Sequence, residues 1–287
     1  MLRICISGLG KTGLEIARAI LEQKDMKLVS AVCSPESSNK GKDVGTMLGI
    51  KPIAVKLTGS DELEKEIFKK KPDVVIDFSN PNAVLKNAQI FSKLKVNMII
   101  GTTGFSKIGQ RRLQVLAKRC HTGIVYAPNI TLGVNVLMFL ANLTANILND
   151  YDFEIMEIHH KHKKDSPSGT AKKIAAEITK GLNSSGVARN AEDINITAVR
   201  AGGVVGKHEI LVVGENDKIE ISHESFNRKA FALGAIRAAR FISGKTGFYE
   251  MSDVLDLDKV LNNYLSDKSK RRGFEPSNNW VDINKVI

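Results

Sequence analysis

The sequence predicts an α/β protein in which a helix-covered parallel sheet is joined to an inserted α+β domain. Short apolar runs alternate with helical segments to about residue 126, a glycine-rich turn follows the first run, and the pattern changes after about residue 127. Strands that alternate with helices favour a parallel sheet with right-handed crossovers. We therefore expect a Rossmann-like dinucleotide-binding domain, residues 1–127 and 229–265, around a second domain, residues 128–228.

The first five predicted strands are rich in Val and Ile and are bounded by turn residues. Continuous apolar runs of this kind fit a sheet that is covered on both faces. Between them, apolar residues recur at helical spacing, as at Leu14, Ala17 and Ile20. The expected strands are Leu2–Ser7, Leu28–Cys33, Asp73–Phe78, Asn97–Gly101 and Gly123–Ala127.

The second domain is expected to begin with a long apolar helix and to end with three closely spaced strands. Short turns between such strands favour antiparallel or mixed pairing. A last apolar helix would return to the first sheet and cover it. The expected elements are helix Leu132–Leu148, strand Phe153–His160, helix Ala171–Leu182, strands Ile194–Arg200, Glu209–Val213 and Lys218–Glu224, and helix Ala230–Ile242.

Residues 266–287 form a predicted tail of different composition. The tail contains a basic cluster, Lys268–Arg272, and the only tryptophan, Trp280. Chain ends are commonly disordered, and disorder is the first expectation for this tail. Its apolar residues, such as Val281 and Ile283, would also suit a strap across this subunit or a neighbouring one.

Composition and charge limit the classes of function that the protein can have. The chain has 42 basic and 31 acidic residues, and its formal net charge of +11 suits small polyanions as well as nucleic acid. Aromatic residues make up only 6%, so stacking platforms for nucleic acid are not expected. Cys5, Cys33 and Cys120 form no Cys-x-x-Cys pair, which argues against a zinc knuckle. With no signal-peptide pattern and no run of ~20 apolar residues, we expect a cytoplasmic protein without membrane or nucleic-acid partners.

A Gly-x-Gly-x-x-Gly motif, Gly8–Gly13, directly follows the first strand and opens the first helix. In such a motif the first glycine permits a tight turn, the second lets backbone approach a pyrophosphate, and the third allows close helix–strand packing. Free amides at the helix start then bind the phosphates. The motif predicts a dinucleotide site made of Gly8, Leu9, Gly10, Lys11, Thr12 and Gly13.

The end of the second strand should select the nicotinamide cofactor. NAD sites usually have an acidic residue there, whereas this chain has Ser34, followed by Glu36, Lys40 and Lys42. An uncharged serine with lysines nearby suits the 2′-phosphate of NADPH better than a bare ribose. Because Glu36 could fold back toward the ribose, NADH stays an alternative to NADPH.

The segment Glu157–Ala171 has the densest chemistry in the chain. Three of the six histidines fall within four positions at the end of a predicted strand. Adjacent strand residues point to opposite faces and the nearby lysines repel a cation, so we expect no metal. Ser168, Gly169 and Thr170 open a helix whose start suits a carboxylate or phosphate, and Lys163 can supply charge or a proton. We interpret the segment as a site for an anionic substrate; a structural basic loop is the alternative.

Further candidates follow later strands, where ligands collect at the carboxyl edge of a parallel sheet. Gly101–Phe105 follows the fourth strand, and Ala127–Thr131 lies at the expected domain junction. There Asn129 could hold a carboxamide or only cap the next helix. Arg228 precedes the last helix and is a candidate carboxylate clamp; a solvent-exposed arginine without this role is the alternative.

Taken in order, these motifs resemble the 4-hydroxy-tetrahydrodipicolinate reductase (dihydrodipicolinate reductase) family. The resemblance covers residues 1 to about 257, and Glu157–Ala171 is its most specific block. The supporting blocks are Asp77–Ser79, Gly101–Phe105, Gly133–Val136, Arg200–Gly202 and Asp253–Leu257.

The resemblance implies reduction of 4-hydroxy-tetrahydrodipicolinate by NAD(P)H, with loss of water, to tetrahydrodipicolinate in diaminopimelate and lysine synthesis. It implies His159 and Lys163 as a proton-donating pair, no metal, and a homotetramer formed through the second domain. The substrate-binding residues expected are His160, Lys163, Ser168, Gly169, Thr170 and Arg228. Besides the glycine loop, the cofactor-binding residues expected are Ser34, Phe78, Ser79, Gly101, Thr102, Thr103, Ala127, Pro128 and Asn129.

Two departures from the family pattern bear on the cofactor. The glycine loop is one residue shorter than in many members, with Lys11-Thr12 where Arg-Met is common. The acidic residue that many members have after the second strand is replaced around Cys33-Ser34. Two other functions stay open: a dehydrogenase of another amino-acid-derived dicarboxylate, and a module that binds nucleotide or nucleic acid without catalysis.

Overall fold

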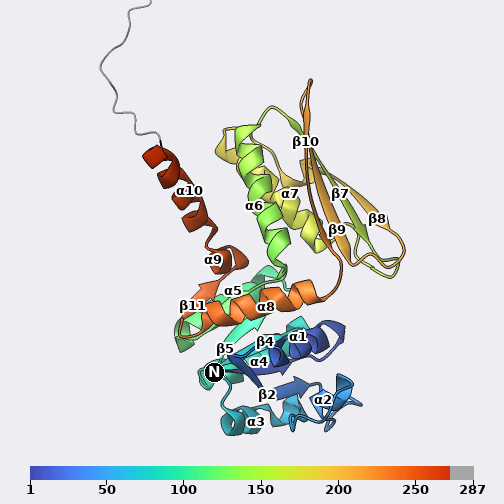
Figure 1. The fold of residues 1–287 in the computed structure, drawn as a ribbon, viewed down its shortest axis with the longest axis vertical. Coiled ribbons are helices and arrows are strands. Elements are labelled where there is room, and N and C mark those ends of the chain that lie inside the picture. The colour runs from blue at the N-terminus through green and yellow to red at the C-terminus, as the bar shows by residue number, and fades with distance from the viewer. Residues whose placement is uncertain (272–287) are drawn as a thin grey trace, which may run out of the picture. The chain divides into compact units, whose positions relative to one another are not determined.

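The computed structural model describes residues 1–271 (Figure 1). Met1–Val254 form one compact unit, and a second unit begins at Leu255, with helix α10 (Leu257–Arg271) as its described element. Helix α10 continues through the first residues of the predicted tail, where Ser, Asp, Lys and Arg can all extend a helix. Trp280 lies outside the described residues, and the domain limits given above stay a prediction.

A seven-stranded sheet with the order β11-β6-β5-β4-β1-β2-β3 carries the glycine motif. All of its pairings are parallel, as predicted. The order reverses direction between β1 and β4, and ligands bind at such a switch point in open α/β sheets. Its strands are β1 (Leu2–Ser7), β2 (Met26–Cys33), β3 (Leu57–Gly59), β4 (Val74–Asp77), β5 (Asn97–Ile100), β6 (Gly123–Tyr126) and β11 (Gly247–Tyr249).

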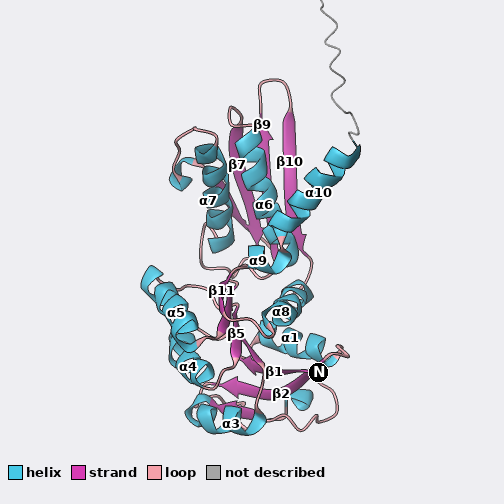
Figure 2. Cartoon of the chain, turned by 90° about the vertical axis from the view of Figure 1, so that its left-hand side faces the viewer, coloured by secondary structure: helices cyan, strands magenta, loops and turns pink. Residues whose placement is uncertain are grey.

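Helices cover both faces of this sheet, which explains its apolar strands. Ile4 and Ile6 of β1 pack beneath α1 and α8, whereas Cys5 points to the opposite face, under α3, α4 and α5. Figure 2 shows α4 and α5 on one side of the sheet and α1 and α8 on the other. The helices of residues 1–255 around this sheet are α1 (Lys11–Leu21), α2 (Val44–Met47), α3 (Leu63–Lys70), α4 (Pro81–Lys93), α5 (Lys107–Cys120), α8 (Lys229–Ile242) and α9 (Met251–Leu255).

A separate four-stranded sheet has the order β10-β9-β7-β8. β7 pairs with β8 in parallel and with β9 in antiparallel fashion, so the predicted mixed pairing is confirmed. One face packs against α6 and α7, where Phe153, Ile155 and Ile210 meet the apolar side of both helices. The elements are α6 (Leu132–Ile147), β7 (Asp152–His159), α7 (Gly169–Ser184), β8 (Asn195–Arg200), β9 (Gly206–Val213) and β10 (Lys218–Ser225). Of the helices in residues 1–271, none has the length and apolarity to cross a bilayer.

Candidate active site

The first glycine of the motif makes the turn out of β1. Gly8 has φ +88°, a left-handed conformation that favours glycine, and its N–H donates to the Val32 carbonyl over 2.9 Å. A Cβ built on Gly8 would lie 2.6 Å from the Phe78 carbonyl oxygen. Both the conformation and the space therefore require glycine here.

The other two glycines differ in what surrounds them. A Cβ on Gly13 would lie 2.1 Å from the Gly8 carbonyl oxygen, so this glycine lets α1 approach the turn. Gly10 is the N-cap of α1, and a Cβ there would meet nothing within 4 Å. The first turn of α1 has no acidic side chain. The helix start thus offers open space and backbone amides to an anion, as a dinucleotide pyrophosphate requires.

Asp77, at the end of β4, organises the neighbouring loops. Its carboxylate accepts hydrogen bonds from Ser79 N (2.8 Å), Ser79 Oγ (2.6 Å) and Thr102 Oγ1 (3.0 Å). Burial raises the pKa of Asp77. A Cβ on Gly101 would lie 2.2 Å from the Phe78 ring, so that ring packs directly on the loop after β5. Phe78 and Ser79 therefore lie beside Gly8, and Gly101 and Thr102 contact Phe78 and Asp77 in turn. Thr103 is exposed.

A cavity of about 270 Å³ opens at the carboxyl ends of β1 and β2 and includes Gly8, Ser34 and Ser79. Its lining has no carboxylate and one basic side chain, Lys86 from α4. Glu36 folds back and accepts a hydrogen bond from Ser34 Oγ, and this bond lowers the pKa of Glu36.

Lys40 and Lys42, which the sequence suggested for a 2′-phosphate, are held elsewhere. Lys40 Nζ lies 2.9 Å from an Asp61 carboxylate oxygen, and Lys42 Nζ donates to Asn39 Oδ1 over 2.8 Å. Lys40 thus pairs with a carboxylate that lies later in the chain, and a role for Lys40 or Lys42 at a 2′-phosphate stays a prediction. Lys86 was not predicted because it reaches the cavity from α4, far in sequence from Ser34.

Asn129 joins the loop after β6 to the start of α7. Its Oδ1 accepts a hydrogen bond from Thr170 Oγ1 over 2.9 Å, and its carbonyl oxygen accepts one from Asn135 Nδ2 over 2.7 Å. The N-cap of α6 is Thr131, so Asn129 is not the cap of that helix. Within residues 1–271, Asn129 Nδ2 is buried and has no hydrogen-bond partner. A buried donor of this kind fits the carboxamide oxygen of a nicotinamide.

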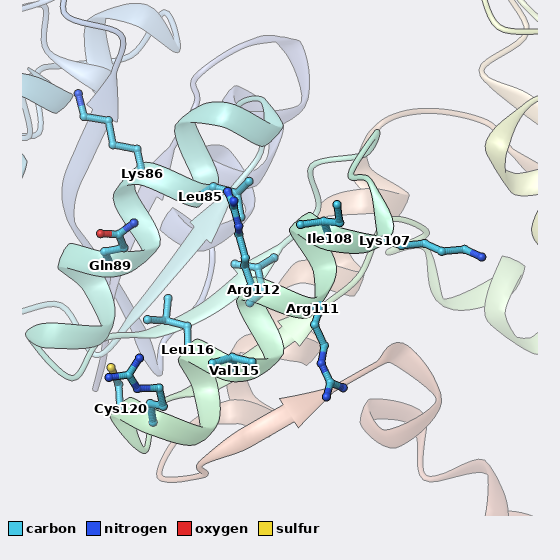
Figure 3. Close-up of a pocket in the computed structure, with 12 residues that line it drawn as sticks. Leu85, Lys86, Gln89, Lys107, Ile108, Arg111, Arg112, Val115, Leu116 and Cys120 are labelled. Carbon is cyan, nitrogen blue, oxygen red and sulfur yellow. The ribbon is translucent and has the colours of Figure 1, made fainter.

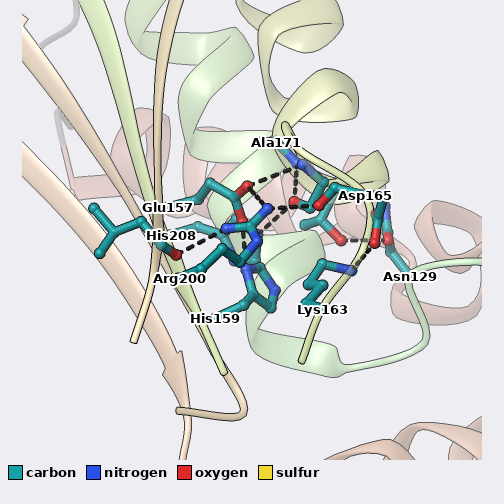
Figure 4. Close-up of polar contacts among 11 residues, drawn as sticks. Asn129, Glu157, His159, Lys163, Asp165, Ala171, Arg200 and His208 are labelled. Atoms are coloured by element: carbon teal, nitrogen blue, oxygen red, sulfur yellow. Dashed lines mark hydrogen bonds and ion pairs between the residues drawn. The ribbon is translucent and has the colours of Figure 1, made fainter. Parts of the chain in front are cut away.

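Glu157 is the centre of the polar cluster drawn in Figure 4. This β7 side chain is fully buried, and its Oε1 accepts hydrogen bonds from Arg200 Nη2 (2.6 Å) and Ser168 N (2.9 Å). Its Oε2 forms an ion-pair contact with His159 Nδ1. Arg200 also donates to the Asp165 carbonyl over 2.7 Å, which anchors the loop before α7. One carboxylate therefore holds together β7, β8 and the start of α7.

The charges in this cluster oppose the effect of burial on the carboxylate. Burial alone would raise the pKa of Glu157, but Arg200, the Ser168 amide and His159 together hold that pKa below its usual value. Burial lowers the pKa of His159, against the opposing effect of Glu157. Glu157 is therefore ionised, and His159 is mainly neutral at neutral pH. With Nδ1 directed at Glu157, Nε2 is the nitrogen left to exchange a proton.

His208 completes the cluster from β9, directly opposite Glu157 in the strand register. Its Nε2 lies 3.4 Å from Ser168 Oγ, and its ring meets the His159 ring edge-on with centroids 5.1 Å apart. Burial is the main cause that lowers the pKa of His208 to about 4, and the positive charge of a protonated His159 is the next. Sequence reasoning missed this residue, although Gly206, His208, Ile210 and Val212 alternate along one buried face.

The expectation that no metal binds has to be compared with a group of three possible ligands, Glu157, His159 and His208. Their ligand atoms lie within 4.8 Å of one another, so the three could hold an ion. His208 comes from a neighbouring strand, so the opposite orientation of adjacent histidines on β7 does not by itself exclude a metal. In the structure Glu157 binds Arg200 and Ser168 instead, and the absence of a metal stays a prediction.

Lys163 and the start of α7 border this cluster. Lys163 Nζ lies 2.8 Å from Asp165 Oδ1, and the lysine side chain is 22% exposed. Burial would raise the pKa of Asp165, but the bond to Lys163 holds it below the usual value. Ser168 caps α7 by accepting from Ala171 N over 3.1 Å, and the first turn has no acidic residue. A cationic side chain and a helix start therefore lie side by side, as an anionic substrate requires.

Two predicted substrate residues lie apart from the cluster. His160 is half-buried beyond the end of β7, and its ring centroid is 6.4 Å from that of His162. Arg228 lines a cavity of about 710 Å³ together with Lys11 and Phe226. Within residues 1–271 no described side-chain hydrogen bond or ion pair joins His160 or Arg228 to the Glu157 cluster, so their substrate roles stay predictions.

The chain matches known proteins along most of its length. Residues 2–130 match the model for the dihydrodipicolinate reductase N-terminus, and residues 133–255 match that for its C-terminus. The 4-hydroxy-tetrahydrodipicolinate reductase of Methanocaldococcus jannaschii is 40% identical over 273 residues, covering 91% of this chain and 99% of the relative. The reductase of the same name from Methanopyrus kandleri is 38% identical over 264 residues, covering 88% and 95%.

A solved structure agrees with these matches. Dipicolinate-bound dihydrodipicolinate reductase from Paenisporosarcina sp. TG-14 superposes with a TM-score of 0.72 and 28% identity, over 87% of this chain and 97% of that chain. The resemblance drawn from the motifs is confirmed. The chain therefore belongs to the dihydrodipicolinate reductase family, which consists of pyridine-nucleotide-dependent reductases with a Rossmann-like fold.

Proposed function

We propose that the protein reduces 4-hydroxy-tetrahydrodipicolinate to tetrahydrodipicolinate in the diaminopimelate and lysine pathway, with NAD(P)H as the reductant. The observation that carries the proposal is the 2.9 Å hydrogen bond between Thr170 Oγ1 and Asn129 Oδ1. It joins the carboxyl edge of the parallel sheet to the anion-binding start of α7. A dinucleotide and an anionic substrate bound at these two places would meet at this contact.

The reaction takes up a hydride and a proton and releases water. A bound reduced nicotinamide supplies the hydride, and Gly8–Gly13, Phe78, Ser79, Gly101, Thr102 and Asn129 would hold that cofactor. His159 carries the proton at Nε2, because Nδ1 is directed at Glu157 and the carboxylate stabilises the imidazolium form. Since burial lowers the pKa of His159, turnover should fall as pH rises and the protonated form is lost.

Lys163 serves the same reaction as a cation and as the second proton donor. Its ammonium group lies beside Asp165 and the start of α7, where it can pair with a substrate carboxylate. Thr170 and Gly169 contribute the open first turn of that helix, and Ser168 fixes its geometry. A cyclic dicarboxylate has two anionic groups for this positively charged surface.

NADPH is the preferred cofactor in this proposal. The cavity around Ser34 has no carboxylate in its lining and has Lys86 as its basic side chain, which suits a 2′-phosphate. Glu36, hydrogen-bonded to Ser34, is the group that would favour NADH. Lys86→Ala should therefore raise the KM for NADPH more than that for NADH, and equal KM changes would remove Lys86 from cofactor selection.

A homotetramer formed through the mixed sheet is the assembly that we propose. The face of this sheet away from α6 and α7 has partly exposed apolar side chains in its central strands, among them Met156, Ile158 and Leu211. Leu211→Glu should dissociate the tetramer in sedimentation velocity, and an unchanged sedimentation coefficient would exclude this face.

The proposed domains are those expected from the sequence. The proposed location is the cytoplasm, where free cysteines stay reduced.

The test is NADPH oxidation, then NADH oxidation, followed by absorbance with freshly generated 4-hydroxy-tetrahydrodipicolinate. A synthase acting on pyruvate and aspartate semialdehyde makes the substrate, and a control contains the synthase alone. Oxidation that requires both proteins would establish the reaction. Cofactor binding without oxidation would exclude this substrate and favour a dehydrogenase of another dicarboxylate.

A further inference from the structure

A groove of about 1030 Å³ lies between α4 and α5, on the outer side of the parallel sheet (Figure 3). Its apolar surface comes from Leu85 of α4 and from Ile108, Val115 and Leu116 of α5. Ile108 is 69% exposed and Val115 is 44% exposed, so the groove leaves large aliphatic side chains in contact with water. Contiguous exposed apolar surface of this kind marks an interaction site in many proteins.

The charged side chains at the border of the groove are all basic. Lys86 of α4 and Lys107, Arg111, Arg112 and Arg119 of α5 line it, and no acidic side chain does. In the part of the chain that the structure describes, none of these five forms an ion pair. The groove thus combines exposed aliphatic side chains with five basic side chains and no carboxylate.

The pattern along α5 matches the dimensions of a helix. Ile108 and Val115 are two turns apart on the exposed side, and Arg111 and Arg112 lie between them. The helix has 14 residues and is therefore about 21 Å long, enough to contact about four turns of a partner helix. Helices that bind in grooves use apolar anchors at such spacing, and charges at the border fix partner choice.

We propose that the α4–α5 groove binds an acidic amphipathic helix of a partner protein. Its apolar side would cover Ile108, Val115 and Leu116, and its carboxylates would pair with the arginines of α5. A second copy of this chain, with its net charge of +11, is a poor electrostatic match. Residues 272–287 are also a poor match, because they have two basic and two acidic residues. Nucleic acid is disfavoured because no aromatic side chain lines the groove for base stacking.

The experiment uses the full-length protein and a fluorescein-labelled helical peptide of about 15 residues, with Leu on one side and Glu on the other. Binding is followed by fluorescence anisotropy. One variant, Arg111→Glu with Arg112→Glu, reverses charge at the groove, and a second, Ile108→Ser with Val115→Ser, removes the exposed aliphatic anchors. Lys65→Glu with Lys69→Glu on α3 is the control, because it changes the net charge equally at another surface.

We expect both groove variants to weaken peptide binding at least ~10-fold, and the α3 control to bind like the original protein. Reductase activity and thermal unfolding should be unchanged in all three, because these side chains are exposed and lie outside the proposed active site. The proposal can therefore fail or succeed independently of the reductase assignment. Equal weakening in the α3 control would show only general charge attraction and would overturn it. The proposal would also be overturned if Arg111→Glu with Arg112→Glu weakened the binding of single-stranded DNA or of anionic vesicles more than the binding of the peptide.

Discussion

The glycine loop and the Glu157 cluster are built from different parts of the chain. The loop holds its ligand with main-chain amides, so its requirements are local: Gly8 must turn and Gly13 must let α1 approach. The Glu157 cluster is built from side chains on β7, β8, β9 and the start of α7, and its members are up to 51 positions apart in sequence. The first site follows from one short motif, whereas the second exists only once the mixed sheet has formed.

The two sites also differ in the free-energy cost of burying charged groups. The loop needs no buried charge, because backbone amides and a helix start attract an anion at little cost. The cluster contains a fully buried carboxylate, which is tolerated because Arg200 and Ser168 bind one oxygen and His159 the other. Changes in the cluster should therefore affect stability, pH dependence and turnover together, whereas changes in the loop should affect cofactor binding.

The largest effect is expected at Lys163. Lys163→Ala should lower kcat by at least ~10²-fold, the scale for loss of a general acid, without changing the Kd of NADPH. Lys164→Ala is the matched control, because Lys164 is an exposed neighbour without a described partner in residues 1–271. Stopped-flow binding and steady-state rates separate the two quantities. Unchanged kcat in Lys163→Ala would remove this lysine from the mechanism.

Two glycines allow steric and functional effects on the loop to be separated. Gly13→Ala should cost about 2 kcal/mol of stability, because its Cβ would be forced against the Gly8 carbonyl oxygen. Gly10→Ala has open space around its Cβ, so it should unfold like the original protein yet bind NADPH more weakly. Thermal unfolding and fluorescence titration test both. Full NADPH affinity in Gly10→Ala would show that phosphates do not approach there.

His208 should make the stability of the folded protein fall as pH falls. The pKa of His208 is lowered to about 4 in the folded state, so the unfolded chain binds more protons between pH 6.5 and 4. Stability should therefore be full above pH 6.5 and decline below it, by about 3 kcal/mol at pH 4. His208→Gln should flatten this decline in urea unfolding measured across that range. An equally steep decline in the variant would assign the proton uptake to other groups.

Much of the fold could be predicted because its cues are local. Apolar runs located β1 and β2, and the glycine motif located the start of α1. The short strands β3 and β11 were missed, since three residues with a turn on each side give almost no periodic pattern. The extent of α10 was missed because its last turns have few apolar residues to reveal a helix.

The candidate site could be predicted only where its residues are neighbours in sequence. His159, Lys163 and the cap at Ser168 belong to one segment, and the structure brings them together around Glu157. His208 was missed because its position opposite Glu157 depends on strand register, which the sequence does not show. Lys86 was missed for the same kind of reason, since it reaches the cofactor cavity from α4.

We expect buried Glu157 to control the protonation of His159 during turnover. The most direct measurement is the pH dependence of kcat for the original protein and for Glu157→Gln. The negative charge of Glu157 raises the pKa of His159, so its removal should move the fall in kcat to lower pH. Glu154→Gln, on the opposite face of β7, is the control and should leave the profile in place. A profile that stays at the same pH in Glu157→Gln would contradict the claim.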